Sequence, residues 1–346
     1  MVNSREKNNN KEPYVALLIT GTCRELLFLL ELMPRLAGET RYDIFLVLRQ
    51  VYQGESSRMG GIEKNCDLRR LNDAVARCES RISGEVIFCR LPAIDPEETL
   101  RRVLIPVGPT TPEREMGMVS MFHGVFTGVE MILASQRPYT HVLKTRTDYL
   151  PAAAPWIDDL LMRYEAAEGR IIVDGCATVA HRYPDRPDIP WQGSIHDVFS
   201  FSSFDQFLQL WDFRRHFDKV WTGIPETTLF RSVMLQLLGD DLQSPRRNQT
   251  LLDRYFVWDE NSSKQSKHLM RAGLLSDELK RELLTMIEQA VLSAEETNRL
   301  LRKLLDYIAG ALDEEMWEHL CDELLGVEKE ALTAMALEAR GKAAPI

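Results

Sequence analysis

The chain has 346 residues, which is enough for one large domain with an appendage or for two domains. It carries 42 Lys and Arg against 52 Asp and Glu; the net charge of −10 would repel nucleic acid and anionic lipid, so we expect no nucleic-acid partner. No stretch approaches the roughly 18 to 20 uninterrupted apolar residues of a membrane span, so any work at a membrane would be done from its side.

Residues 1–12 are polar and rich in Asn, and they lack the apolar segment of a secretory signal. We interpret them as a disordered tail. The six cysteines are scattered without a Cys-x-x-Cys pair, so we expect reduced thiols, some packed as small hydrophobic side chains, and a cytoplasmic protein. They are Cys23, Cys66, Cys78, Cys89, Cys176 and Cys321.

The first elements predict a parallel start to the sheet. Residues 14–21 are a run of strand formers that ends in Gly21, and residues 22–25 (Thr-Cys-Arg-Glu) have the spacing of a helix capping box. Apolar residues at helical spacing continue to a stop at Gly38, and residues 42–48 are typical of a second buried strand. A strand, a helix and a strand in this order favour a βαβ unit.

Helices and strands continue to alternate after this unit. We predict helices over residues 67–79, 113–136, 156–167 and 204–213, a helix that begins at Pro225 and Glu226, and strands over 85–91, 141–149, 169–174 and 195–201. Residues 49–65 and 175–194 lack periodicity and are interpreted as loops. Beyond residue 262 only amphipathic helical patterns remain, so we expect an α/β domain over 13–262 and an all-helical subdomain over 263–346.

A charged strand is the main functional signal. In residues 141–149, Lys144, Arg146 and Asp148 alternate with other residues, so a strand would place all three on one face. Charges of both signs at a strand end suit a site for an anionic ligand and a metal ion, because ligands gather at the carboxyl ends of strands in open α/β sheets. The alternative is a structural ion pair, with Asp148 capping a turn.

Four segments of the chain resemble a known family. Residues 14–24, the helix before His141, residues 142–149 and residues 195–201 are similar to the WavE-type lipopolysaccharide-synthesis family of bacterial glycosyltransferases. The Lys-Thr-Arg-Thr-Asp block that ends at Asp148 is the most specific of these. The resemblance covers roughly residues 14–260 and leaves the helical tail outside.

This resemblance implies a GT-A-like glycosyltransferase, with a Rossmann-like, mostly parallel sheet that holds a nucleotide-sugar donor. Asp148 would bind a divalent metal, Mn²⁺ or Mg²⁺, at the donor diphosphate, and Gly21 and Arg24 would lie near the nucleotide. The chain departs from the family's usual Asp-x-Asp pattern, since Arg146 occupies the place of the first Asp. Arg146 and Lys144 would then neutralise the diphosphate, Arg through paired hydrogen bonds and Lys as a point charge.

An inverting transfer also needs a base for the acceptor hydroxyl. Asp197 and Glu226 are the best placed carboxylates in the sequence. Asp197 interrupts an apolar run next to His196, although a buried, hydrogen-bonded structural Asp is an equal alternative. Glu226 has the alternative role of an acidic residue in the first turn of a helix.

Other enzyme classes lack their motifs here. The turn after residue 20 is neither Gly-x-Gly-x-x-Gly nor a P-loop, and Gly-x-Ser-x-Gly and His-Glu-x-x-His are absent from the sequence. With these classes set aside, the resemblance implies a glycosyltransferase acting on a cell-envelope glycan or lipid-linked acceptor, at the periphery of the inner membrane. We also expect a homo-oligomer formed through the C-terminal helices. The alternatives are a noncatalytic scaffold that uses those helices and, less favoured, a methyltransferase.

Overall fold

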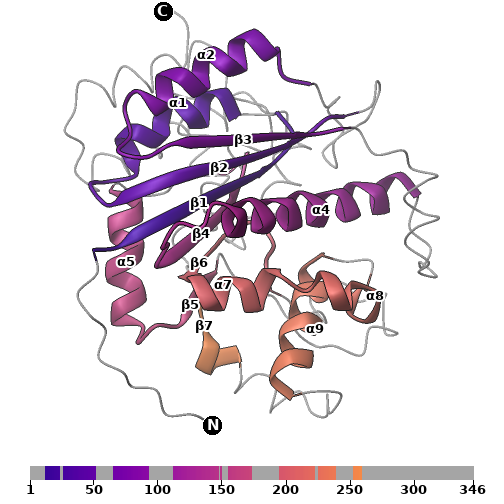
Figure 1. The fold of residues 1–346 in the computed structure, drawn as a ribbon. Helices are drawn as coiled ribbons and strands as arrows, with labels where there is room; N and C mark the ends of the chain where they lie inside the picture. Colours follow the sequence, from indigo (N-terminus) through magenta and orange to yellow (C-terminus); the bar gives the residue numbers. More distant parts are fainter. Residues whose placement is uncertain are drawn as a thin grey trace, which may run out of the picture.

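The computed structural model describes residues 12–23, 26–51, 65–92, 112–147, 149, 155–173, 195–222, 225–238 and 252–258. Seven strands form one sheet in the order β3-β2-β1-β4-β6-β5-β7 (Figure 1). The strands are β1 (Tyr14–Gly21), β2 (Arg41–Arg49), β3 (Val86–Leu91), β4 (His141–Arg146), β5 (Ile171–Val173), β6 (Ser200–Ser203) and β7 (Phe256–Trp258). The helices are α1 (Leu26–Leu36), α2 (Leu68–Glu79), α4 (Pro112–Ala134), α5 (Trp156–Ala166), α7 (Phe204–Trp211), η1 (Arg214–His216), α8 (Phe217–Val220) and α9 (Pro225–Leu238).

The pairing of the strands confirms the predicted α/β class with a mostly parallel sheet. The pairs β1/β2, β1/β4, β2/β3 and β5/β7 are parallel, and only β6 runs antiparallel to its neighbours β4 and β5. The predicted βαβ unit is confirmed as β1, α1 and β2. The short strand β7 and the segment η1–α8 were not predicted.

Helices cover both faces of the sheet because successive strand residues point to opposite faces. In β1, Val15, Leu17 and Ile19 pack with α1, α2 and α5, whereas Ala16 and Leu18 pack with α4, α7 and α9. Figure 1 shows α4 lying along the sheet with α7, α8 and α9 on the same side, and α1 beside α2. The two layers bury both faces of the central strands β1, β2 and β4, whereas most of β3 is only half-buried.

Helix α4 lies unusually close to β1. A Cβ atom added at Gly128 would lie 2.3 Å from Leu18 Cδ1, whereas one added at Gly124 would meet only Thr20 Cβ, at 4.0 Å. Glycine at position 128 is therefore needed for the contact between helix and strand. This close packing helps to bury the central strand completely on the α4 face.

A buried carboxylate ties together the amino edge of the sheet. Asp43 at the start of β2 accepts hydrogen bonds from the Tyr14 and Tyr139 hydroxyls, Arg137 Nη1 and the Glu85 amide. Burial alone would raise the pKa of Asp43, but these bonds outweigh it and hold that pKa below its ordinary value. The network joins β1, β2, the approach to β3 and the approach to β4.

One predicted strand is partly wrong. Of residues 195–201, only Ser200 and Phe201 lie in β6, which then continues to Ser203. The residues before β6 bond elsewhere, because the Ile195 amide donates to the Glu226 carbonyl and the Asp197 carbonyl accepts from a lysine. Asp197 therefore lies in an irregular segment and does not interrupt a strand.

The other predicted elements agree to within a few residues at their ends. The strand predicted over 141–149 stops at Arg146, and a turn follows. The predicted tail over residues 1–12 (except residue 12), the loop at 175–194, most of the loop at 49–65 and the helical subdomain over 263–346 lie outside the described residues. They stay predictions.

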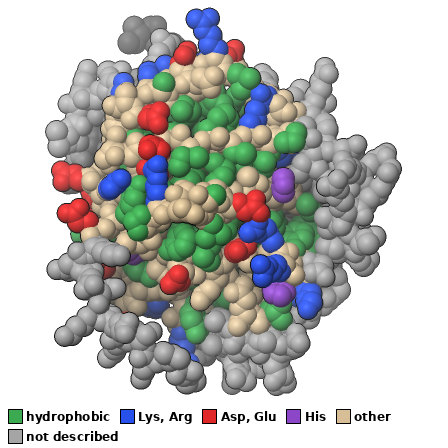
Figure 2. All heavy atoms as spheres, viewed as in Figure 1, with side chains coloured by type: hydrophobic (Ala, Val, Ile, Leu, Met, Phe, Trp, Pro, Cys, Tyr) green, Lys and Arg blue, Asp and Glu red, His purple; other side chains and the backbone are tan. Residues whose placement is uncertain are grey.

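The surface agrees with the mixed charge of the sequence. Figure 2 shows acidic and basic side chains interspersed among the described residues of the face that carries α4, with no large patch of one sign on that face. In the described part of the chain, no helix combines the length and hydrophobicity that crossing a membrane requires.

Candidate functional site

The order of the strands identifies the edge where a ligand would bind. From β1 the chain moves in one direction through β2 to β3, and it then returns to place β4 on the other side of β1. The carboxyl ends of β1 and β4 are thus neighbours at a point where the direction of winding reverses. In open α/β sheets, ligands bind outside such ends.

Gly21 lets the ends of β1 and β4 approach each other. Its φ of +146° is a conformation that side chains disfavour, and an added Cβ would lie 2.6 Å from Thr147 Oγ1. The Thr147 amide also donates to the Thr20 carbonyl at 3.2 Å. Gly21 therefore lies beside the turn that follows the charged strand, and its place near a nucleotide stays a prediction.

Arg146 and Asp197 form an ion pair at this edge. Arg146 Nη1 lies 3.9 Å from Asp197 Oδ2, and the side chains are 19% and 8% exposed. Because β6 runs antiparallel to β4, the segment that enters β6 lies beside the carboxyl end of β4 and brings Asp197 to it. The guanidinium is partly exposed, so a ligand at this edge of the sheet can reach it.

Lys144 has a different contact from the expected one. Its side chain is completely buried, its Nζ donates to the Asp197 carbonyl, and it lies 4.4 Å from the centre of the Trp211 ring. Trp211 in turn donates from Nε1 to Ser200 Oγ at 2.9 Å. Lys144 thus binds the main-chain carbonyl of Asp197, while Arg146 forms an ion pair with the side chain of the same residue.

Glu226 lies close to this segment through the backbone. Pro225 begins α9 at a position where its missing amide costs nothing, and Glu226 follows in the first turn. The Glu226 carbonyl accepts from the Ile195 amide at 3.0 Å, two residues before Asp197, and Glu226 is 6% exposed. The structure therefore brings both candidate bases to the same end of the sheet.

Two buried hydroxyls add polar groups near these residues. Within the described residues, Thr20 Oγ1 and Thr227 Oγ1 have no hydrogen-bond partner. Thr20 pairs in register with Arg146 across β1 and β4, and Thr227 follows Glu226 in α9. Buried polar atoms usually have partners, so water or a ligand atom is the expected partner here.

Two of the predicted site residues lie outside the described residues. These are Asp148, the expected metal ligand, and Arg24, expected near the nucleotide. Among the described residues, no three His, Cys, Asp or Glu side chains gather as a metal site would require. The described side chains by themselves therefore do not fit a metal, and the metal stays a prediction that depends on Asp148.

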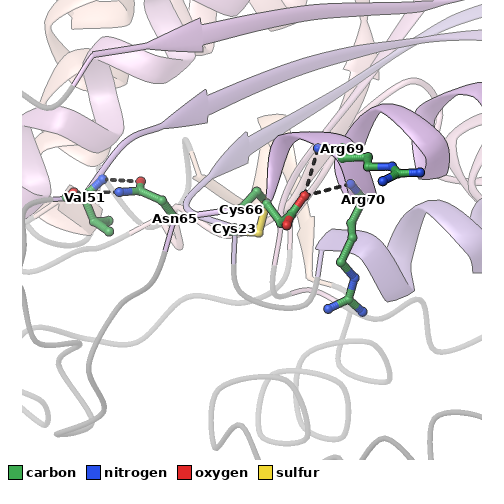
Figure 3. The surroundings of a disulfide bond; sticks show 7 residues. Cys23, Val51, Asn65, Cys66, Arg69 and Arg70 are labelled. Carbon is green, nitrogen blue, oxygen red and sulfur yellow. Dashed lines mark hydrogen bonds between the residues drawn. A yellow bond between two sulfur atoms is a disulfide. The ribbon is translucent and has the colours of Figure 1, made fainter.

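A disulfide at the same edge was not expected. Cys23 and Cys66 are bonded, with a Cα–Cα distance of 5.2 Å, so the prediction that all cysteines are reduced is wrong for this pair (Figure 3). Cys78 and Cys89 are free thiols, and burial raises the pKa of Cys78 to about 12. The sequence held one signal: Cys23 follows the first strand and Cys66 precedes a helix of the same sheet, which places both at one edge.

The disulfide also bears on the expected cytoplasmic location. Disulfides persist mainly in oxidising compartments and are rare in the reducing cytoplasm. The expected location depended on reduced cysteines, and it loses that support.

The fold and the edge residues define an α/β protein with a charged region at the switch point of its sheet. No protein-family profile and no curated protein match the chain. Among solved structures, the apo form of mouse xyloside xylosyltransferase 1 is similar over 72% of this chain and 95% of that chain, at 12% identity and a TM-score of 0.34. A similarity this low bears on neither family nor activity, so the WavE-type resemblance stays a prediction from the sequence.

Proposed function

We propose that the chain is a glycosyltransferase that takes a sugar from a nucleotide-sugar donor and transfers it to a glycan or lipid-linked acceptor. The observation that supports this most is the placement of Arg146 at the end of β4, at the switch point beside Gly21. A partly exposed guanidinium at such a point suits the phosphates of a nucleotide. The resemblance of the Lys-Thr-Arg-Thr-Asp block to a glycosyltransferase family supports a nucleotide sugar as the ligand.

In this proposal the chemistry is a displacement at the anomeric carbon. The acceptor oxygen bonds to that carbon, the bond to the phosphate oxygen breaks, and the nucleoside diphosphate leaves. Asp197 takes the proton of the acceptor hydroxyl, with Glu226 as the second candidate. Arg146 has two tasks: it orients Asp197 by their ion pair and it offsets charge on the leaving diphosphate.

The proposed metal would be held by Asp148 and would neutralise diphosphate charge when bound. Every step assigned above to Arg146, Asp197 and Glu226 stands without it. Lys144 is proposed to support Asp197 in place of direct contact with a phosphate, because its side chain is buried against Trp211.

A thermal-shift screen of nucleoside diphosphates, with and without Mn²⁺, tests the donor site. A ligand at 100 times its Kd stabilises a protein by about 2.7 kcal/mol, which the melting temperature reports. We expect one nucleoside diphosphate to raise it, and Arg146→Gln to weaken binding roughly 10- to 100-fold, the equivalent of one charge-assisted hydrogen bond. Arg163→Gln on α5, with its side chain 36% exposed and away from the switch point, is the matched control.

Activity variants separate the roles. Asp148→Asn should abolish transfer and leave the melting temperature nearly unchanged, and Asp197→Asn should abolish transfer but leave the nucleotide affinity nearly unchanged. Full activity of the first variant would exclude the metal site. If no nucleotide shifts the melting temperature, the scaffold alternative replaces the enzyme.

A further inference from the structure

Two contacts join three segments of the chain at the carboxyl edge of the sheet. The Cys23–Cys66 disulfide joins the turn after β1 to the residue before the α2 cap. The Asn65 side chain accepts from the Val51 amide at 2.9 Å and donates to the Val51 carbonyl at 3.0 Å, which ties the same segment to the end of β2 (Figure 3). We call these two contacts the rim clamp.

The rim clamp is fixed on the side of α2. Asp67 caps this helix, and its Oδ1 accepts from the amides of Arg69 at 2.9 Å and Arg70 at 3.1 Å. Helix α2 packs on the sheet through Leu71 and two further buried residues. The segment that carries Asn65 and Cys66 is thus attached to a rigid element.

On the other side, the clamp holds the turn that leads from β1 into α1. The Cys23 carbonyl accepts from the amide of Leu26, the first residue of α1, at 2.8 Å, so the disulfide is on the residue that bonds to the start of this helix. This turn begins at Gly21, which already touches the turn after β4. The disulfide therefore restrains the end of the described segment that follows Gly21.

We infer that the rim clamp positions the β1–α1 turn for the phosphates of the donor, so that ligand affinity depends on the oxidation state of Cys23 and Cys66. This inference rests on the proposed function, which places the donor at the switch point. It also implies that the protein acquires its ligand-binding form where disulfides form, in an oxidising compartment. Cys23, Asn65 and Cys66 are positioning residues, because they act through the turn.

The disulfide is open to reduction. Cys23 and Cys66 are both partly exposed, whereas Cys78 is buried and its raised pKa makes it a poor nucleophile for exchange. A small dithiol reductant would break the S–S bond and leave two thiols, while the reductant closes to its own disulfide and supplies two electrons and two protons. Because Asn65 and Val51 still bond after reduction, the fold of the sheet should persist.

The first experiment maps the bond. Unreduced full-length protein is unfolded, alkylated and digested, and mass spectrometry should find a peptide pair that links Cys23 to Cys66, with Cys78 and Cys89 alkylated. Alkylation of all six cysteines would overturn the inference at this step.

The second experiment measures affinity before and after reduction. Calorimetric titration with nucleoside diphosphates and Mn²⁺ should give a Kd that rises about tenfold on reduction, as it does when only about a tenth of the molecules keep a competent turn. Reoxidation should restore the first value, and the far-UV circular dichroism should stay unchanged throughout. If reduction only lowered the stability of the fold, the Kd measured at a temperature well below the melting temperature would not change.

Variants give an independent version of the same measurement. The double variant Cys23→Ser/Cys66→Ser should bind under all conditions with the affinity of the reduced parent protein. Asn65→Leu should lower the affinity of the oxidised protein. The control variant Cys89→Ser should bind the nucleotide and respond to reduction as the parent does. If binding is equally strong in the reduced protein, the positioning role is wrong and the proposed function stands. If the mapped disulfide is present but the oxidised protein binds no nucleotide, both the positioning role and the proposed function are wrong.

Discussion

Replacing Asp43 with Asn tests whether the amino edge of the sheet depends on one ionised carboxylate. Asp43 is completely buried and lies 2.6 Å from both Arg137 Nη1 and the Tyr139 hydroxyl. The Tyr14 hydroxyl donates to the same oxygen, and the Glu85 amide donates to the other at 2.8 Å. Asn keeps the shape but presents one oxygen and one NH₂ group to four donors.

The expected cost follows from this mismatch. The substituted amide side chain best keeps its oxygen toward the two hydroxyls and Arg137, so its NH₂ group faces the Glu85 amide and that hydrogen bond is lost. A hydrogen bond to a charged group contributes about 1.5–3 kcal/mol, and the three remaining bonds weaken because their acceptor becomes neutral. We expect a loss of about 3–5 kcal/mol, in the range for removing one partner of a buried ion pair.

Urea unfolding at neutral pH measures this loss, and a pH series checks its origin. The folded pKa of Asp43 lies below its unfolded value, so its stabilisation is complete above about pH 4 and is lost as the pH falls through the folded pKa. The difference between parent and Asp43→Asn should therefore shrink in acid. Tyr139→Phe, which removes one donor, should cost about 1–2 kcal/mol at neutral pH.

A loss below about 1 kcal/mol for Asp43→Asn would refute this reasoning. So would a difference between the two proteins that stays constant from neutral pH to well below about pH 4. Glu85→Gln is a useful control, since this carboxylate also pairs with Arg137 but is 59% exposed, and exposed pairs contribute at most about 1 kcal/mol.

Four further substitutions test the close contacts and the half-buried histidine. Gly21→Ala should cost at least about 1–3 kcal/mol in urea unfolding, because φ is +146° and the added Cβ would lie 2.6 Å from a hydroxyl oxygen. Gly128→Ala should lower stability by up to about 2 kcal/mol, because the added Cβ clashes with Leu18. Gly124→Ala should raise stability by up to about 1 kcal/mol, because Ala has the higher helix propensity. Equal effects of the two substitutions would exclude the close contact between α4 and β1. Burial lowers the pKa of His141 to about 4, so the parent should lose stability as the pH falls from about 6.5 to 4, and His141→Phe should lack this part of the acid titration.

The elements that could be predicted from the sequence are those with strong local patterns. The strand Tyr14–Gly21 is predicted to the residue, because a continuous apolar run ends in a glycine. Helix α2 begins at Leu68, one residue after the predicted start, because the Asp67 side chain caps the helix and accepts from two free amides. In both cases the residues that decide the structure are adjacent in the chain.

The parts that were missed depend on partners distant in sequence. Residues 195–199 look like a strand, but Ile195 bonds to Glu226 and Asp197 bonds to Lys144, so long-range contacts decide their conformation. The order of the predicted elements places Cys23 and Cys66, 43 positions apart, at one edge, but no local pattern indicates that their sulfur atoms meet. The sequence places Lys144 in the region of the site. It does not predict the contact of Lys144 with Trp211, because Trp211 is distant in sequence.

The sheet has two buried groups of charges, and their positions indicate different roles. Asp43 lies at the amino edge of the sheet, where four donors from this chain bind one carboxylate. Its charge is fully used inside the protein, so its effect should be on stability alone. Arg146 is at the carboxyl edge, partly exposed, with its Asp197 contact at the long distance of 3.9 Å. A partly exposed cation at a switch point can be reached by an added anion, so ligand effects should appear on substitution of Arg146 and be absent on substitution of Asp43.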